Sequence, residues 1–532
     1  MTARFSIFSR TLGAAVAGAL LCGVTVAGAR AETALRIAMT ASDIPDYVGQ
    51  PDQGLEGFRF VGFQLYEGLI GWDLSDADKE PALRPLLAKS WKVDDTDKKK
   101  WLFELQENVK FHDGCEWNAD VAIWNLERLT KEGVAQFNPV NFARARSLTN
   151  AIAGFEKTGD YSIAITTTQE HSLFPFLVPR ILMISKCAYE AAGNDYQAYA
   201  KNPSGTGPYK FVNAVPRERL ELAKNEAYWD ETRIPKQDSL VLIPMPEATT
   251  RAAALMSGEV DFIEAPSPDT IPRLKSSGMN VITGPYPHTW SYVLNFQNGA
   301  FSNLKVRQAA NYAINRAEMV ALLDGIALES YGFFLPSVAY RGDPVKYEYD
   351  PEKAKALLEE AGCLPCTITV AMSTSGSGQM QPLPMNELVK AQLEAVGFQV
   401  KFDVMDWNAM VEIFRKGAAE YPQYDAINYS LAVLDPLTGF INHVVTDARA
   451  PSGSNWGWYD NKEVDDLARQ ALATFDPEQQ AELIRKMHEA VVADAGRVFI
   501  VHDTNPRALA PNVKGFVQAQ SYFVDLTQVT VE

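Results

Sequence analysis

A chain of 532 residues with 66 acidic and 49 basic residues carries a formal net charge of −17 at pH 7, which argues against nucleic acid or anionic lipid as its partner. Its length is sufficient for several domains. After residue 31, no segment approaches the about 20 apolar residues that a membrane-spanning helix needs, so we expect a soluble mature chain.

Residues 1–31 have the pattern of a secretory signal peptide. Two arginines precede an apolar run rich in alanine and glycine, which ends in the small-x-small site Ala29-Arg30-Ala31. An uncleaved membrane anchor is less favoured because the glycines dilute the apolar run. A lipoprotein anchor at Cys22 is disfavoured because the bulky Leu21 precedes it. We therefore expect cleavage before Glu32, which leaves a formal net charge of −20.

Four cysteines remain in the mature chain, and an exported protein can oxidise them. Cys363-Leu-Pro-Cys366 has the spacing of a thioredoxin-like redox pair, but such a pair opens a helix that follows a strand. Here the pair follows a helix that ends at Gly362 and precedes a strand, which favours a structural disulfide in a loop. A four-cysteine zinc site is weaker still, because Cys115 and Cys187 have no close partner in the sequence.

The periodicity of apolar residues predicts a mixed α/β fold over the mature chain. In chain order we expect a strand at 35–39, a loop at 43–54, a helix at 58–69, a strand at 101–105, a helix at 118–129, strand segments at 209–222, a helix at 247–258, a strand at 292–296, helices at 303–314 and 350–361, a strand at 367–371, a helix at 386–396, a strand at 399–404, a helix at 477–493 and a strand at 497–501. The strand-helix-strand run from 367 to 404 predicts a parallel pair. The sequence contains no repeat of 20 to 50 residues, which argues against a solenoid or propeller.

The segment from Asn202 to Phe211, NPSGTGPYKF, places two glycines and two prolines within six positions. This spacing fits neither a P-loop nor a dinucleotide-binding loop. Because glycine adopts unusual dihedral angles and proline fixes its own, Gly205 to Pro208 should form a tight turn of defined shape. We expect that turn to lead into a strand at Tyr209.

Seven short blocks, taken together and in order, resemble one family. They are Tyr66-Glu-Gly-Leu69, Ala88-Lys-Ser-Trp91, Phe111-His-Asp-Gly114 with Ala119-Asp-Val121, Gly205-Thr-Gly-Pro-Tyr209, Ser257-Gly-Glu-Val-Asp261, Val306-Arg-Gln-Ala-Ala310 and Asp350-Pro-Glu-Lys-Ala354. The chain thereby resembles the extracytoplasmic solute-binding proteins of peptide/nickel-type ABC importers, over nearly the whole mature chain.

This resemblance implies an α/β fold with two lobes, a periplasmic-binding-protein fold of type II-like, cluster C organisation, with an extra inserted subdomain. The implied boundaries are 32–65, 200–288 and 499–532 for lobe I, 66–199 for the inserted subdomain and 289–498 for lobe II. In the family, the Gly-Thr-Gly-Pro-Tyr turn carries the chain from the inserted subdomain back into lobe I.

The resemblance also implies a function. Such a protein captures a solute in the cleft between its lobes, in the periplasm, and delivers it to inner-membrane permease subunits driven by cytoplasmic ATPases. Short peptides are the default solute. The alternatives are an opine-like conjugate, an oligosaccharide, a metal chelate or haem, or a non-transport role as a chaperone or sensor partner. We expect a monomer with no cofactor, no bound metal, no nucleic-acid partner and no enzymatic activity, since hydrolase motifs are absent from the sequence and the six histidines are dispersed.

The segment from Tyr424 to Pro436 departs from the family pattern. In peptide receptors this region supplies an aspartate that pairs with the free α-amine of the peptide. Here the spacing is shorter and only Asp435 remains, so the anchor for the amine is either shifted or missing.

Nine residues are candidates for ligand contact: Glu56, Tyr286, His288, Trp290, Trp407, Arg415, Asp435, Trp456 and His502. Trp407 and Tyr286 match an aromatic residue of the family's cleft, whereas Arg415 lies near the family's cation for the ligand carboxylate. Ordinary roles stay open for most of them: a core, rim or packing position for the aromatic residues and His288, a solvated helix end for Arg415 and a satisfied structural histidine for His502.

Overall fold

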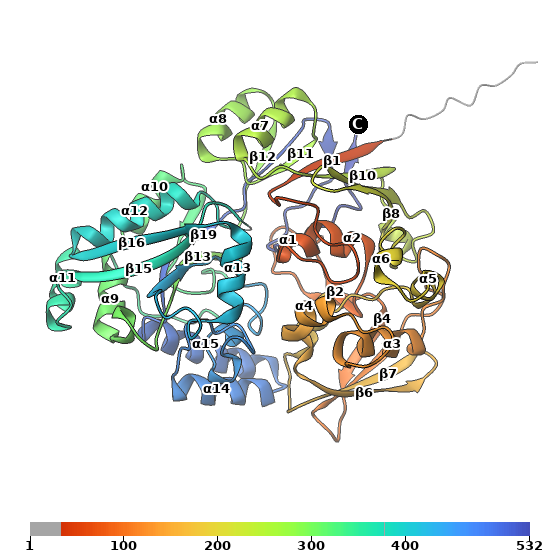
Figure 1. Cartoon of the computed structure of the whole chain (residues 1–532), viewed down its shortest axis with the longest axis horizontal. Coiled ribbons are helices and arrows are strands. Elements are labelled where there is room, and N and C mark those ends of the chain that lie inside the picture. The colour runs from red at the N-terminus through yellow and green to blue at the C-terminus, as the bar shows by residue number, and fades with distance from the viewer. Residues whose placement is uncertain (1–32, 377) are drawn as a thin grey trace, which may run out of the picture. The chain divides into compact units, whose positions relative to one another are not determined.

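Two seven-stranded sheets and a four-stranded sheet organise residues 33–376 and 378–532, the part of the chain that this computed structural model describes (Figure 1). The expected signal peptide at 1–31 lies outside these residues. In the described ranges, no helix combines the length and apolarity needed to span a membrane. The mixed α/β class predicted from the sequence is confirmed by these sheets and the helices around them.

The first sheet has the strand order β12-β20-β11-β1-β10-β9-β8. Its strands are β1 (Ala34–Met39), β8 (Tyr209–Val215), β9 (Arg219–Lys224), β10 (Ser239–Pro244), β11 (Phe262–Glu264), β12 (Asn280–Ile282) and β20 (Arg507–Leu509). Strand β1 is parallel to both β10 and β11. Helices α7 (Ala248–Ser257) and α8 (Ile271–Ser276) lie beside β11 and β12 (Figure 1).

The second sheet has the order β14-β19-β13-β17-β15-β16, with β18 paired to β13. Its strands are β13 (His288–Leu294), β14 (Ala327–Glu329), β15 (Cys366–Ser373), β16 (Phe398–Met405), β17 (Ala426–Asn428), β18 (Leu431–Ala432) and β19 (Arg497–Asp503). Its helices are α9 (Leu304–Ala313), α10 (Arg316–Leu322), α11 (Pro351–Glu360), α12 (Pro382–Ala395), α13 (Trp407–Lys416), α14 (Lys462–Ala473) and α15 (Pro477–Ala493). Strands β15 and β16 are parallel and joined through α12, as the strand-helix-strand pattern predicts.

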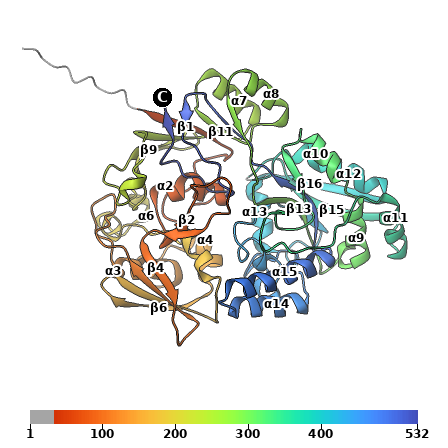
Figure 2. The same cartoon turned by 180° about the vertical axis from the view of Figure 1, so that it is seen from behind.

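The four-stranded sheet is antiparallel in the order β4-β5-β7-β6. It consists of β4 (Ala88–Val93), β5 (Lys100–Leu105), β6 (Ile152–Gly159) and β7 (Ser162–Thr167), accompanied by α3 (Ala119–Thr130), α4 (Pro139–Thr149), α5 (Lys186–Ala191) and α6 (Tyr196–Tyr199). Two small pairs complete the strands: β2 (Ile70–Trp72) with β3 (Leu83–Pro85), and β21 (Val513–Lys514) with β22 (Thr530–Val531). Seen from behind, the four-stranded sheet lies on the same side as the first sheet, away from α9 to α12 (Figure 2).

The chain passes twice between the first and second sheets, once between β12 and β13 and once between β19 and β20. Strands β13 and β19 pair with each other in the second sheet. Residues 499–503, which the sequence boundaries assign to lobe I, therefore hydrogen-bond within the second sheet. The exact division into lobes and inserted subdomain stays a prediction, and below we refer to the sheets.

Several helix ends form as the sequence predicts, because a side chain or a glycine satisfies the terminal backbone groups. The side-chain oxygen of Asn118 accepts the N–H of Val121 at 3.1 Å, and Asp350 accepts the N–H of Lys353 at 2.9 Å. Helix α7 ends at Gly258, whose φ of 77° is left-handed. These local signals fixed the starts and ends of α3, α11 and α7 within about one residue of the prediction.

The predicted helix at 58–69 is wrong in its extent. The structure has a short helix α1 (Leu55–Gly57), a π-helical turn (Phe58–Gly62) and a second short helix α2 (Phe63–Leu65), after which Tyr66 is extended. The carbonyl of Leu65 accepts the N–H of Gly207 at 3.0 Å instead of continuing the helix. A contact with a distant segment thus ends the helix earlier than the local pattern indicates.

The same contact explains the two glycines of the Gly-Thr-Gly-Pro-Tyr turn. A Cβ atom at Gly205 would lie 2.0 Å from the carbonyl oxygen of Leu65, and one at Gly207 would lie 2.5 Å from the carbonyl oxygen of Gln64. Neither glycine has a left-handed φ. The close approach of two backbones, rather than the dihedral freedom on which the sequence argument relied, therefore requires glycine here.

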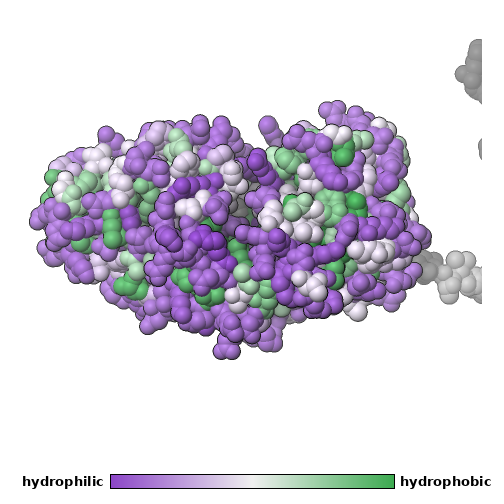
Figure 3. All heavy atoms as spheres, turned by 90° about the horizontal axis from the view of Figure 1, so that it is seen from below, coloured by the Kyte–Doolittle hydropathy of each residue, from purple (hydrophilic) through white to green (hydrophobic). Residues whose placement is uncertain are grey.

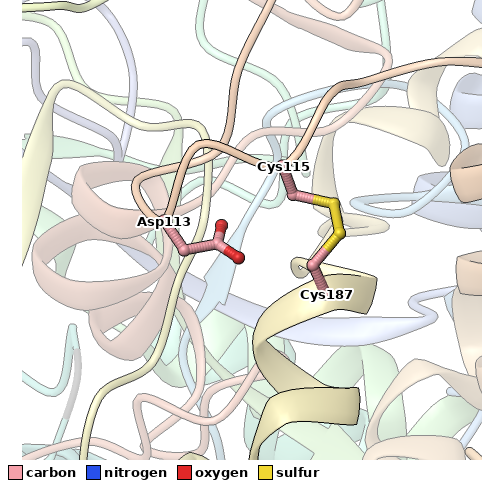
Figure 4. Close-up of side chains that lie close together, drawn as sticks. All are labelled: Asp113, Cys115 and Cys187. Atoms are coloured by element: carbon pink, nitrogen blue, oxygen red, sulfur yellow. A yellow bond between two sulfur atoms is a disulfide. The ribbon is translucent and has the colours of Figure 1, made fainter.

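Both cysteine pairs form disulfides. Cys363 bonds to Cys366 between the end of α11 and the start of β15, as the sequence predicts. Cys115 bonds to Cys187 on α5 and ties that helix to the turn after Phe111, a pairing that the sequence left open (Figure 4).

Candidate functional site

Two cavities lie where the first sheet, or the segment that follows its strand β1, faces the second sheet. The first, about 150 Å³ in volume, has charged and amide side chains in its walls, and we call it the polar cavity. The second, about 230 Å³, contains the rings of Trp407, Phe414 and Tyr429 in its wall, and we call it the aromatic cavity. Tyr522 borders both. Figure 3 shows a largely hydrophilic surface that is hollowed near the middle of this view.

A buried network of charges forms one wall of the polar cavity. Glu264, at the end of β11, accepts a hydrogen bond from Nε of Arg507 at 2.9 Å and pairs with Nη1 of Arg59 at 3.1 Å. All three side chains are almost fully buried. Burial alone would raise the pKa of Glu264, but Arg507 and Arg59 outweigh it and hold that pKa below its usual value. The carboxylate therefore stays ionised and fixes both guanidinium groups.

Arg59 owes its position to the π-helical turn at Phe58–Gly62, which points its guanidinium toward the first sheet. The guanidinium carbon lies 4.3 Å from the centroid of the Tyr522 ring, a cation–π contact. Glu56 supports the same region: its carboxylate accepts the N–H groups of Thr40 at 2.8 Å and Ala41 at 3.1 Å. Glu56 thus holds the loop after β1 and does not line either cavity.

Asp503 lines the polar cavity from the second sheet, at the last position of β19. One carboxylate oxygen accepts the N–H of Asn505 at 2.7 Å. Burial raises the pKa of Asp503 to about 7, although Arg507 and the N–H of Asn505 oppose this rise. Near neutral pH the carboxyl group is consequently divided between its neutral and ionised forms, so a nearby cation could favour the ionised form.

Three side chains that line the polar cavity carry polar atoms without a hydrogen-bond partner among the described residues. These atoms are Nε of Arg59, the hydroxyl of Tyr286 and Nδ2 of Asn505. Each side chain is more than nine-tenths buried. Because buried polar groups are nearly always hydrogen-bonded in folded proteins, this set indicates a bound molecule or ordered water at the cavity.

A stack of three rings forms the wall of the aromatic cavity. The centroids of Trp407 and Tyr429 are 5.2 Å apart with an interplanar angle of 16°, and those of Phe414 and Tyr429 are 4.2 Å apart at 6°. The loop after β15 packs against this stack so closely that a Cβ at Gly376 would lie 2.4 Å from the Trp407 ring. Such a flat wall suits the face of a planar or apolar ligand group.

Neutral histidines and one arginine supply the polar groups of the aromatic cavity. Burial lowers the pKa of His288 to about 3, and the neighbouring His502 adds to the effect. Burial likewise lowers the pKa of His443 to about 3, with Arg497 adding to it. Arg180 also lines this cavity and has its pKa lowered by burial, against the attraction of Asp435. The cavity therefore offers one cationic group amid neutral rings.

The structure brings three of the predicted contact residues to the cavities. Tyr286 lines the polar cavity, whereas His288 and Trp407 line the aromatic cavity. Trp407 begins α13 directly after β16, and Asp406 caps that helix by accepting the N–H of Ala409 at 3.1 Å. Arg415 lies in the last turn of the same helix and is exposed, with no ion pair in the described chain.

The other predicted residues lie elsewhere. Trp290 and Trp456 are fully buried in hydrophobic cores, and Nε1 of Trp456 donates to the carbonyl of Ile413 at 3.1 Å. His502 is buried within β19. Asp435 is buried too, but it lines a third cavity and accepts the N–H of Thr438 at 2.6 Å. Trp290 and Trp456 thus occupy core positions, the ordinary role left open by the sequence, whereas Nδ1 of the buried His502 has no hydrogen-bond partner among the described residues. None of the four side chains lines the polar or the aromatic cavity.

Sequence reasoning missed Arg59, Asp503 and Tyr522 as candidate residues. Arg59 is an arginine within the apolar run Phe58 to Val61, a pattern that could have suggested a buried and functional charge. Asp503 and Tyr522 give no comparable local signal, because their approach to the cavity depends on the path of the chain after β19.

One group of side chains has the composition of a metal site but a different role. Asp113, Cys115 and Cys187 lie close together (Figure 4). The two sulfur atoms are bonded to each other and so provide no thiolate for a metal. Asp113 accepts the hydroxyl groups of Ser204 at 2.7 Å and Ser185 at 2.9 Å. The group therefore fastens the turn at 111–115 to its neighbours.

Two sheets joined by two crossings, with a polar cavity lined by strands of both, define a two-lobed solute-binding protein. The family model for bacterial extracellular solute-binding proteins, family 5 Middle, matches residues 82–484, and the chain belongs to this family. The predicted resemblance is thereby confirmed, and the chain is a solute-binding component of the ABC importer type.

Individual relatives agree with this assignment. The glutathione-binding protein GsiB of Escherichia coli K12 is 29% identical over 466 residues, which cover 86% of each chain. The periplasmic binding protein DppA of Helicobacter pylori, solved with the peptide STSA, aligns with a TM-score of 0.81 and 24% identity over 94% of this chain and 99% of its own. NikA of Staphylococcus aureus, solved with Ni(L-His)2, aligns at 0.76 and 18% identity over 94% and 100%. These structures confirm the two-lobed fold.

Proposed function

We propose that this chain captures short peptides or peptide-like solutes in the periplasm, as a monomer, and passes them chemically unchanged to the permease subunits of an ABC importer. Ligand contacts from both sheets favour the closed arrangement of the lobes, and the difference in contact free energy between open and closed states sets the affinity. A micromolar dissociation constant corresponds to about −8 kcal/mol, within reach of a few buried polar contacts and aromatic stacking.

One observation carries this proposal: the polar and aromatic cavities meet at Tyr522, and each is lined from both sides of the crossings. The polar cavity is lined by Glu264 of β11 and Asp503 of β19, and the aromatic cavity by Phe58, in the segment after β1, and His288 of β13. A peptide needs such a combination, since its charged and amide groups require polar partners while its side chains require apolar surface. Relatives named for glutathione and for peptides support a peptide-like solute, whereas a relative solved with a nickel–histidine complex keeps a chelate as the second candidate.

The test combines ligand identification with binding. Mass spectrometry of the protein purified under mild conditions should reveal a co-purified peptide or conjugate. Calorimetric titration should then give micromolar or tighter binding for members of a dipeptide and tripeptide panel, and X-ray scattering should show a smaller radius of gyration with a bound peptide. Binding of a sugar, haem or nickel–histidine without binding of any peptide would overturn the peptide proposal. Turnover of a bound solute would overturn the role as a pure binding protein.

A further inference from the structure

We propose that the polar cavity binds a free α-amino-acid head group, with its ammonium and carboxylate on one carbon atom, and that the rest of the solute extends into the aromatic cavity. This inference rests on the proposed capture of a peptide-like solute and adds to it the chemical class of the solute. The favoured solutes are amino-acid conjugates such as γ-glutamyl peptides, rather than ordinary α-linked peptides, which have no carboxylate on the carbon that bears the amine.

The donors on the polar cavity's wall fit a carboxylate. Nε of Arg59, the hydroxyl of Tyr286 and Nδ2 of Asn505 are buried and without partners among the described residues. Two of the three are donors only, and the hydroxyl can donate. The remaining nitrogens of Arg59 face Glu264 at 3.1 Å and Glu56 at 3.9 Å, so its Nε is the part left for a ligand. A carboxylate, which accepts several hydrogen bonds at once, satisfies such a set best.

The acid in the same cavity fits an ammonium group. Asp503 reaches the cavity from the second sheet, whereas Arg59 reaches it from the segment that follows β1 of the first sheet. Glu264 is held by two arginines, and Glu56 by Thr40 and Ala41. Glu247 also lines the cavity, but it is exposed to solvent, where pairing with a cation contributes little. Asp503 is therefore the carboxyl group of this cavity best able to pair with a cation. Asp435, the residue left from the family's amine anchor, is held by Thr438 at a different cavity.

The net charge of the buried side chains favours a head group with one positive and one negative charge. The buried cluster contains three arginines, Arg59, Arg251 and Arg507, but only two carboxylates, Glu264 and Glu56, so it has one excess positive charge while Asp503 is neutral. Arg59 and Arg507 form its ion pairs. Arg251 is already satisfied by four backbone carbonyls. An anion alone would pair with the excess positive charge but leave Asp503 without a cation. A cation alone would pair with Asp503 but would lie close to two arginines of the same charge. A zwitterion can pair with the positively charged cluster through its carboxylate and with Asp503 through its ammonium group.

The size of the cavity agrees with this group. A cavity of about 150 Å³ corresponds to about five water molecules at their liquid volume of about 30 Å³ each, and so accommodates the few non-hydrogen atoms of an amino-acid head group. The contact at Tyr522 leads from there to the stack of Trp407, Tyr429 and Phe414, where a side chain such as phenylalanine finds a flat apolar wall.

The sharpest test uses two isomers of equal charge and composition, γ-glutamyl-phenylalanine and α-glutamyl-phenylalanine. Only the γ-linked isomer keeps ammonium and carboxylate on one carbon. By calorimetric titration the native protein should bind the γ-linked isomer at least about tenfold more tightly. Tyr286→Phe and Asp503→Asn should each reduce this preference several-fold, while Tyr349→Phe and Asp95→Asn, at exposed positions, should preserve it.

Both variants should stay folded, so a reduced preference would report on binding. Tyr286→Phe removes a hydroxyl that has no partner among the described residues, and Asp503→Asn removes a buried acid. Circular dichroism melting curves check this point. Equal affinities for the two isomers, a preference for the α-linked isomer, or a preference that survives both substitutions would overturn the head-group inference and leave peptide capture standing. If neither isomer nor any peptide of the panel binds, both proposals fall.

Discussion

The polar and aromatic cavities share Tyr522 but are built in different ways. The wall of the polar cavity consists of charges that are already paired across β11, β20 and the π-helical turn. The wall of the aromatic cavity consists of stacked rings from α13 and the segment after β17, against which a glycine loop packs. Substitutions of the paired charges in the first wall should therefore change mainly the free energy of unfolding, whereas substitutions of the stacked rings in the second should change mainly the affinity for solute.

The largest effect is expected from Glu264→Ala, which would leave Arg59 and Arg507 buried without their shared carboxylate. The loss of one partner from a buried ion pair costs about 3–5 kcal/mol of unfolding free energy. Lys89→Ala, which breaks an exposed pair with Glu107, is the control and should cost at most about 1 kcal/mol. Urea denaturation followed by circular dichroism measures both. A cost below 1 kcal/mol for Glu264→Ala would show that the paired charges do not hold this wall together.

The next effect concerns pH. The pKa of Asp503 is about 7 in the folded chain, against an ordinary value of 3.8. Between these values the folded state keeps a proton that the unfolded state has lost, so this residue's contribution to stability falls as pH rises from about 4 to 7. Arg507 and Glu264 are the charged groups that act on it. Asp503→Asn should therefore be more stable than the native protein at pH 8, by about 2–4 kcal/mol, with no difference near pH 4.

Urea unfolding of the native protein and of Asp503→Asn at pH 4, 6 and 8 measures this difference. Asp95→Asn, at an exposed position, is the matched control and should leave the unfolding free energy unchanged at each pH. A difference between native and Asp503→Asn proteins that is constant with pH would contradict the assignment of the titration to Asp503.

A smaller effect is expected at the glycine loop that lines the polar cavity and packs against the Trp407 ring. Gly376 has a φ of 138°, and a Cβ there would lie 2.4 Å from the Trp407 ring. Gly376→Ala should thus displace the ring, cost about 1–3 kcal/mol and alter the near-ultraviolet circular dichroism of tryptophan. Gly154→Ala is a suitable control, because a Cβ at Gly154 meets nothing within 4 Å and its φ is not left-handed. An unchanged tryptophan signal in Gly376→Ala would refute the close packing of loop and ring.

The elements whose signals are local could be predicted from the sequence. The strand-helix-strand unit from β15 to β16 and the caps at Asn118 and Asp350 depend on residues only a few positions apart. The end of α2 could not be predicted, because the N–H of Gly207 competes for the carbonyl of Leu65. Long-range contacts override local helix propensity at such a point.

The site was harder to predict than the fold for the same reason. Trp407 and Trp456 are both tryptophans of the second half of the chain, yet one borders a cavity and the other is sealed in a core. Their difference arises from which strands and loops cover each ring, and neither ring's neighbours in sequence reveal it. Likewise, Arg59 gains its role from Glu264, a residue on another strand far along the chain.

Trp407→Ala should have the smallest effect on stability but a selective effect on binding. Trp407 is only half-buried, so its loss should cost less than about 2 kcal/mol, below the range for fully buried rings. If the ring stacks on the solute, affinity for γ-glutamyl-phenylalanine should fall about tenfold, while affinity for γ-glutamyl-glycine, which lacks a ring, should change little. Trp91→Ala, at a half-buried position on β4, should match the stability cost and leave both affinities intact. Equal losses of affinity for the two ligands would mean that Trp407 shapes the whole cleft, including the polar cavity. The two walls would then not bind separate parts of the solute.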